Sequence, residues 1–233
     1  LSSAQSINAG FNDATSTIRV HRVVASNSCP IDLSGLPSVT GPVRGEDRLE
    51  FVINDAEMRM GDMDDVSGAS QTPISLNDPA SLLVAPGSFK PHTKVTISSV
   101  ADATVRIGKD FSFSHTDETT INLESTVVQF DGADKQLVEA GGFDIGTRTP
   151  IAPNFGFGQM IVGTDTQATT VYLSDAIDNG NGHVLCGPGE EALYLLGLPA
   201  DPGNPAKIID GLRILGGSTL VLNGIPLYTM QDG

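Results

Sequence analysis

The feature that most constrains this 233-residue chain is the alternation of apolar and polar residues in short runs, each closed by glycine, asparagine or aspartate. The clearest example extends from Thr104 to Gly132, where TVRI, FSFS, TTINL and TVVQF are separated by GKD, HTDE and ES. A period of two places every second side chain on one face of a β-strand. The pattern therefore predicts short strands joined by turns, with little helix.

Within this stretch, apolar residues at alternate positions are expected to face a core. They form four pairs: Val105 and Ile107, Phe111 and Phe113, Ile121 and Leu123, and Val128 and Phe130. Phe155 and Phe157 alternate in the same way, and we expect them in the core rather than on an exposed aromatic platform for sugars. The later segment EALYLLGL is a strand candidate that could instead form one or two helical turns.

The same spacing, with a turn every six to twelve residues, extends from RLEFVIND to IPLYTMQDG near the end of the sequence. Repeated short strands of this kind fit a parallel β-helix, also called a β-solenoid, or a β-sandwich. The NG and DG dipeptides favour hairpins, whereas strands after IGKD and LES continue without clear hairpin pairs. We predict an all-β fold, a right-handed parallel β-solenoid, with the β-sandwich as the alternative.

The first part of the chain departs from this pattern. It includes the proline-rich segment SCPIDLSGLPSVTGPVRG, and proline cannot donate a hydrogen bond to a neighbouring strand. We therefore expect residues 1–43 to form an irregular N-terminal segment or cap and residues 44–233 to form the solenoid domain. A cap would cover the strand edges and core that an end coil exposes.

The segment VRIGKDFSFSHTDETTINLESTVVQFDGADKQLVEAGG resembles the coils of large secreted bacterial β-helix surface proteins, such as adhesins and autotransporter passengers. The later segment DGLRILGGSTLVLNGIPLY resembles their final coils. The likeness covers roughly residues 80–233 and is one of spacing and turn choice, so it bears on fold more than on function. It implies a surface protein with a solenoid fold.

Composition limits the partners. The formal net charge of −15 and the pI of about 4.4 disfavour binding to nucleic acid or to anionic lipid. No apolar run approaches the length of a membrane helix, so we expect no membrane insertion. LSSAQSINAG lacks the features of a signal peptide. The expected extracellular or cell-surface location therefore rests on the scarcity of lysine and the abundance of Thr, Ser, Asn, Asp and Gly.

Two acidic segments are candidates for calcium, which prefers oxygen ligands. In the first, NDAEMRMGDMDD, the candidate ligands are Asp62, Asp64 and Asp65. In the second, SDAIDNGNGH, they are Asp175, Asp178 and Asn179. Acidic turns in an acidic protein are more often simply solvated, so the sequence leaves two interpretations open: no cofactor, or calcium.

The two cysteines, Cys29 and Cys186, are far apart and have no zinc-site spacing. They are candidates for one disulfide in an oxidising compartment. Two unpaired thiols are the equally open alternative.

The sequence offers little for catalysis. The GxSxG motif is absent and the four histidines are scattered. Some parallel β-helices cleave polysaccharides with grouped carboxylates and basic residues, and the candidates for such a group are Asp102, Arg106, Asp110 and Asp117. Any exposed strand face presents a similar pattern, so we expect no enzyme, with a polysaccharide lyase or glycosidase as the alternative.

Together these observations predict an extracellular structural or adhesive protein. We expect it to self-associate into a homo-oligomer or polymer, as filaments or a surface layer, and to contact glycans or other surface proteins. A carbohydrate-binding domain is the main alternative, weakened by the absence of tryptophan. A viral spike or capsid component also remains open.

Overall fold

The structure is a computed structural model that describes residues 6–10, 17–115, 118–147, 154–177, 191–200 and 208–230. Within these ranges the chain forms 22 β-strands and one short 3₁₀ turn at Glu118–Thr120. The predicted all-β class is confirmed. No helix in the described part is long and apolar enough to cross a membrane.

The strands of the N-terminal half lie in three parallel sheets. The first consists of β1 (Ile7–Asn8), β4 (Val39–Thr40) and β7 (Val66–Ser67). The second consists of β2 (Val20–Ser26), β5 (Arg48–Asn54), β8 (Thr72–Leu76) and β10 (Val95–Ser99). The third begins with β3 (Ile31–Leu33), β6 (Glu57–Met60), β9 (Leu82–Ala85) and β11 (Thr104–Ile107).

The third sheet continues into the C-terminal half, where a fourth parallel sheet joins it. The third sheet adds β12 (Leu123–Phe130), β15 (Phe157–Val162), β17 (Glu191–Leu195) and β14 (Gly142–Phe143), with β20 (Leu212–Ile214) beside β15 and β22 (Leu227–Thr229) beside β17. The fourth sheet consists of β13 (Lys135–Glu139), β16 (Thr170–Ser174) and β21 (Thr219–Val221). A separate pair consists of β18 (Leu198–Pro199) and β19 (Ile208–Ile209).

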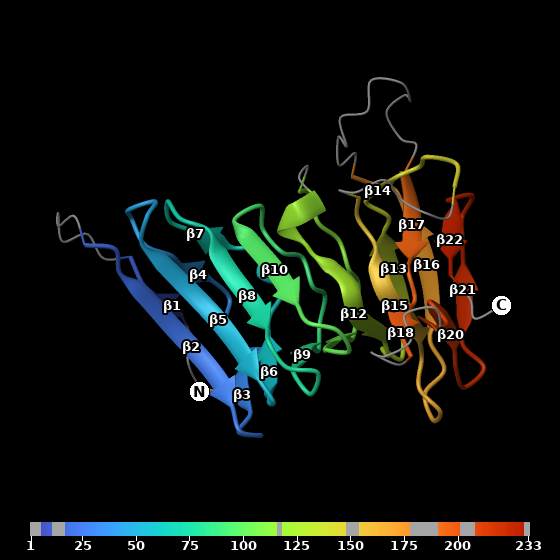
Figure 1. Ribbon diagram of the computed structural model, residues 1–233, viewed down its shortest axis with the longest axis horizontal. Helices are drawn as coiled ribbons and strands as arrows, with labels where there is room; N and C mark the ends of the chain where they lie inside the picture. Colours follow the sequence, from blue (N-terminus) through green and yellow to red (C-terminus); the bar gives the residue numbers. More distant parts are fainter. Residues whose placement is uncertain are drawn as a thin grey trace.

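Pairing between the named strands is almost entirely parallel. In the described residues, only β14–β17 and β18–β19 are antiparallel. Successive partners in the third sheet stay in register, so that Leu83, Val105 and Val128 lie side by side. The strands follow one another along the long axis of the molecule (Figure 1). A β-sandwich is built from antiparallel sheets, so this pairing differs from that of the alternative fold.

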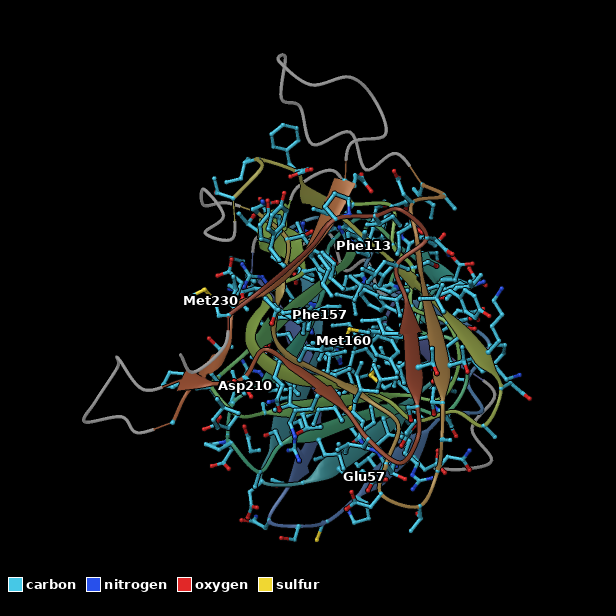
Figure 2. All side chains as sticks on the ribbon, turned by 90° about the vertical axis from the view of Figure 1, so that its right-hand side faces the viewer. Glu57, Phe113, Phe157, Met160, Asp210 and Met230 are labelled. Carbon is cyan, nitrogen blue, oxygen red and sulfur yellow. The ribbon has the colours of Figure 1, made fainter. Side chains whose placement is uncertain are left out.

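The core is formed by the inward rows of these sheets. The eight residues of the four predicted pairs are all buried, as are Phe155 and Phe157, so this prediction is confirmed. Figure 2 shows Phe157 and Met160 in the interior. Phe111 is close to several rings, with centroids 6.3 Å from Phe89 and 5.8 Å from Phe157. Burying one such side chain contributes about 1.5–3 kcal/mol.

Two local expectations can be compared with the structure. EALYLLGL contains strand β17, whose five residues are all buried, so the helical alternative is wrong. Because all five strand residues are buried, the alternation that marks a half-exposed strand is missing from this segment. In the N-terminal region, β2, β3 and β4 lie before residue 44 and pair with later strands. The sheets are therefore continuous across the predicted boundary between residues 43 and 44.

Candidate functional site

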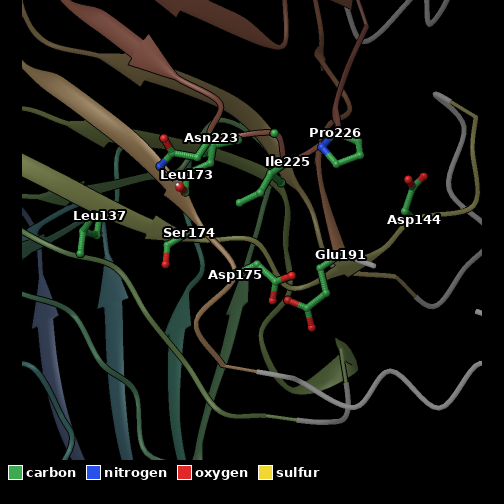
Figure 3. Close-up of a pocket in the computed structure, with 10 residues that line it drawn as sticks. Leu137, Asp144, Leu173, Ser174, Asp175, Glu191, Asn223, Ile225 and Pro226 are labelled. Carbon is green, nitrogen blue, oxygen red and sulfur yellow. Dashed lines mark hydrogen bonds between the residues drawn. The ribbon is translucent and has the colours of Figure 1, made fainter. Parts of the chain in front are cut away.

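A pocket of about 740 Å³ opens beside the C-terminal ends of β13 and β16 (Figure 3). Its lining combines acidic, amide and apolar side chains, and the turn between β21 and β22 forms one side. The lining residues are Leu137, Asp144, Leu173, Ser174, Asp175, Glu191, Asn223, Gly224, Ile225 and Pro226. Pockets of this size can hold a small molecule.

Three carboxylates meet at this pocket: Glu139, Asp175 and Glu191. One carboxylate oxygen from each lies within 4.8 Å of the other two. The local sequence explains the meeting, because Glu139 ends β13 opposite Ser174, the last residue of β16, and Asp175 follows. Glu191 begins β17. Three strand ends therefore bring the acids together.

Glu139 is the most constrained of the three. It is buried, and its Oε1 atom accepts the backbone N–H groups of Ala176 at 2.8 Å and Ile177 at 2.7 Å. Burial raises the pKa of the Glu139 carboxyl; the two N–H groups oppose that shift, and the nearby charge of Asp175 adds to it. The carboxylate is therefore held in place, in an environment that disfavours its charge.

Three carboxylates this close can share a proton or ligate one hard cation through oxygen. The set includes Asp175 from the sequence prediction, together with Glu139 and Glu191, which that prediction did not include. A weak signal for those two residues was present in the sequence: each is an acid at one end of a strand candidate, next to apolar residues, in KQLVE and EALYL. Calcium binding remains a prediction.

Two tyrosines bond to the segment that carries Asp144, one of the residues that line the pocket. The rings of Tyr194 and Tyr228 stack with centroids 5.0 Å apart. The Tyr228 hydroxyl donates to Asp144 Oδ1 at 2.8 Å, and the Tyr194 hydroxyl donates to the carbonyl of Phe143 at 3.2 Å. The hydrogen bond to Asp144 raises the pKa of Tyr228 to about 12. The Tyr228 phenol therefore stays protonated and fixes Asp144.

The other calcium candidates are not brought into this cluster. Asp62, Asp64 and Asp65 are exposed, and the backbone N–H of Asp64 donates to Asp62 Oδ1 at 3.4 Å. In the described part of the chain these three acids join no group of metal-ligating side chains. Asp178 and Asn179 lie outside the described residues.

Three of the four residues considered for polysaccharide cleavage lie in the described part of the chain. Arg106 pairs with Asp131, with Nε 2.9 Å from Oδ2. Asp110 Oδ1 accepts the N–H of Leu137 at 2.8 Å, and Asp102 sits at a turn with φ of 67°. Asp117 lies outside the described residues.

Of the disulfide candidates, Cys29 is exposed in the turn after β2, whereas Cys186 lies outside the described residues. The disulfide thus stays a prediction. In comparisons with known proteins, no family model, no curated protein and no solved structure matches this chain.

Proposed function

We propose that this chain is a structural β-solenoid that associates end to end with further copies of itself in an extracellular or cell-surface scaffold. The single observation that carries the proposal is the exposure of the apolar core at the end formed by β20, β21 and β22. The order of the strands and the strand edges at the opposite end give further support.

The order of strands is what stacked coils would produce. Consecutive strands β4, β5 and β6 fall in the first, second and third sheets, and β7, β8 and β9 do the same one position further along. Each of these two triplets thus contributes one strand to each of the three sheets. In a solenoid, every coil contacts only its neighbours, so an end coil leaves one side of its core uncovered.

Apolar side chains are exposed at the C-terminal end of the stack. Ile214 pairs with Val162, yet Ile214 is 46% exposed while Val162 is 0% exposed. Leu222 lies two residues after Leu220, the partner of Val171, and is 40% exposed, whereas Leu173, two residues after Val171, is 0% exposed. Covering this end would bury apolar surface, and each Å² removed from water contributes a favourable free energy of about 25 cal/mol.

The opposite end offers strand edges. Strands β1, β2 and β3 each lie at the edge of their sheets. Val20 and Val24 on β2 are 41% and 42% exposed. An edge strand presents main-chain groups that can pair with another chain. Joining β1–β3 of one copy to β20–β22 of another would be a head-to-tail contact, which produces filaments when it does not close into a ring.

Sedimentation velocity over a range of concentrations tests this proposal. The substitutions Ile214→Asp and Leu222→Asp each place a charge at the exposed end. Because the native side chains are already partly exposed there, we expect both variants to fold. Val100→Asp is the matched control, because Val100 is 38% exposed but lies between β10 and β11, away from both ends. Wild type and the control should form species that grow with concentration, while the two end variants stay monomeric. A wild-type monomer at every concentration would refute self-association.

Glycan binding is the second candidate, favoured by the acidic pocket beside the fourth sheet. Hydroxyl groups of a sugar could bond to Asp175, and Tyr172 lies in the adjacent outward row. Lys135 Nζ lies 4.0 Å from the Tyr172 ring centroid, so a sugar would have to displace it to stack there. Binding on a glycan panel that is lost in Asp175→Asn would favour this candidate over the scaffold.

A further inference from the structure

A second polar site lies at the corner where the chain enters β5 and β8. Three buried oxygen atoms have no hydrogen-bond partner within the described residues: Asp47 Oδ2, Ser70 Oγ and Thr72 Oγ1. Their residues are 0%, 4% and 0% exposed, respectively. Buried polar atoms are nearly always satisfied, and an unsatisfied group in a folded protein calls for a water or an ion.

Strand register brings the three residues together. Phe51 of β5 pairs with Ile74 of β8. Going back from this pair, Leu49 and Asp47 are buried on one side and Thr72 and Ser70 on the other, at alternate positions. Continued back by four residues, this register would set Asp47 beside Ser70, with Thr72 one step further along the same inward row.

Two glycines bound the same corner. A Cβ atom added to Gly41 would lie 3.1 Å from the carbonyl oxygen of Ser67, 3.7 Å from Thr72 Oγ1 and 3.9 Å from Ser70 Oγ. Gly68 approaches Gly41 so closely that its own Cβ would lie 2.7 Å from the Gly41 carbonyl oxygen, at a φ of +111°. The Gly41 α-carbon is therefore faced by three oxygen atoms from the next turn of the chain.

The chemistry of this corner favours a positive ligand. Asp47 Oδ1 accepts the backbone N–H of Arg19 at 2.8 Å, and Asp47 makes no ion pair within the described residues. Lys94 Nζ donates to the Gly68 carbonyl, on the other side of this corner from Asp47 in the sequence. A water would complete the hydrogen bonds but leave the buried carboxylate charge uncompensated. An anion would be repelled by the carboxylate.

We propose that Asp47, Ser70 and Thr72 bind one monovalent cation of the sodium type. One carboxylate balances a single positive charge, and the two hydroxyls add neutral oxygen ligands of the kind that hard cations take. Calcium takes about 6–8 oxygen ligands, usually with more than one carboxylate, whereas the side chains here supply three oxygens and one carboxylate. The ion would join the segment before β5 to the segment before β8, and so hold neighbouring turns of the chain together.

Thermal unfolding tests the site in the intact chain. With choline chloride replacing NaCl at constant ionic strength, the wild-type Tm should rise by about 3–5 °C for each tenfold increase in Na⁺ above its Kd. Thr72→Val keeps the shape of the side chain and removes one ligand, and Asp47→Asn removes the charge; both should lose this dependence. Asp134→Asn is the matched control, because Asp134 is exposed, and it should behave as wild type.

A crystal soaked in a thallium(I) salt gives a direct readout even where a variant fails to fold. The proposal expects an anomalous peak within bonding distance of Asp47 Oδ2. A Tm that is equal in Na⁺ and choline would overturn the proposal, and so would density at this corner without thallium signal, which would identify a water.

Discussion

The carboxylates of Glu139 and Asp175 lie within 4.8 Å of each other, because Glu139 ends β13 and Asp175 directly follows β16, its neighbour in the fourth sheet. Because burial disfavours the charge of Glu139 and Asp175 adds a like charge, the pKa of Glu139 is raised in the folded state. This relationship makes stability depend on pH.

The direction of this pH dependence follows from the difference in proton binding between the folded and the unfolded state. A carboxyl whose pKa is higher in the folded than in the unfolded state favours folding at low pH, and this contribution disappears as the pH rises through the folded pKa. Glu139→Gln keeps an oxygen that can accept the N–H groups of Ala176 and Ile177 and removes the charge. We expect this variant to be more stable than wild type at pH 7, with a difference that shrinks towards pH 4.

Urea unfolding at several pH values measures this effect. Glu124→Gln is the control, because Glu124 lies outside the cluster; its difference from wild type should not follow the same curve. If Glu139→Gln and wild type differ by the same amount at pH 4 and pH 7, the raised pKa of Glu139 is not what links stability to pH.

A second prediction concerns a tight corner of the stack. A Cβ atom on Gly132 would lie 2.0 Å from the carbonyl oxygen of Gly108, whereas one on Gly87 would meet nothing within 4 Å. We expect Gly132→Ala to destabilise the fold by about 1–3 kcal/mol because backbone atoms must move apart. Gly87→Ala should change stability by less than about 0.5 kcal/mol. Equal costs in denaturant unfolding would contradict the close stacking of these corners.

A third prediction concerns the aromatic core. Phe111 is 1% exposed and lies near Phe89, Phe113, Phe155 and Phe157. Phe111→Ala should cost about 3–5 kcal/mol, because it opens a cavity among these rings. Leu137→Ala, at a residue that is 39% exposed, should cost less than about 1 kcal/mol. Calorimetry that gave similar losses for both would place Phe111 outside the core.

Much of the fold follows from the sequence because alternation fixes which side chains face inward. The row of Val105 and Ile107 was predictable in this way, and both residues are buried. Alternation does not tell which strand lies beside which, since parallel and antiparallel neighbours need the same inward row. The pairing of Val105 with both Leu83 and Val128 therefore had to come from the structure.

The candidate site was less predictable. Asp175 was noticed within an acidic turn, but Glu139 and Glu191 join it only because three strand ends meet. Asp47 was hidden for a similar reason, since it lies just before β5 in the sequence and its burial follows from the folded packing rather than from the local pattern. Charge density along the sequence led instead to Asp62, Asp64 and Asp65, which are exposed.

Electron microscopy of the purified wild-type chain tests the central claim most directly. The scaffold account predicts filaments about one chain wide, in which the long axis of the stack follows the filament axis. Uniform single particles at every concentration would contradict end-to-end association and direct attention to glycan binding at the acidic pocket.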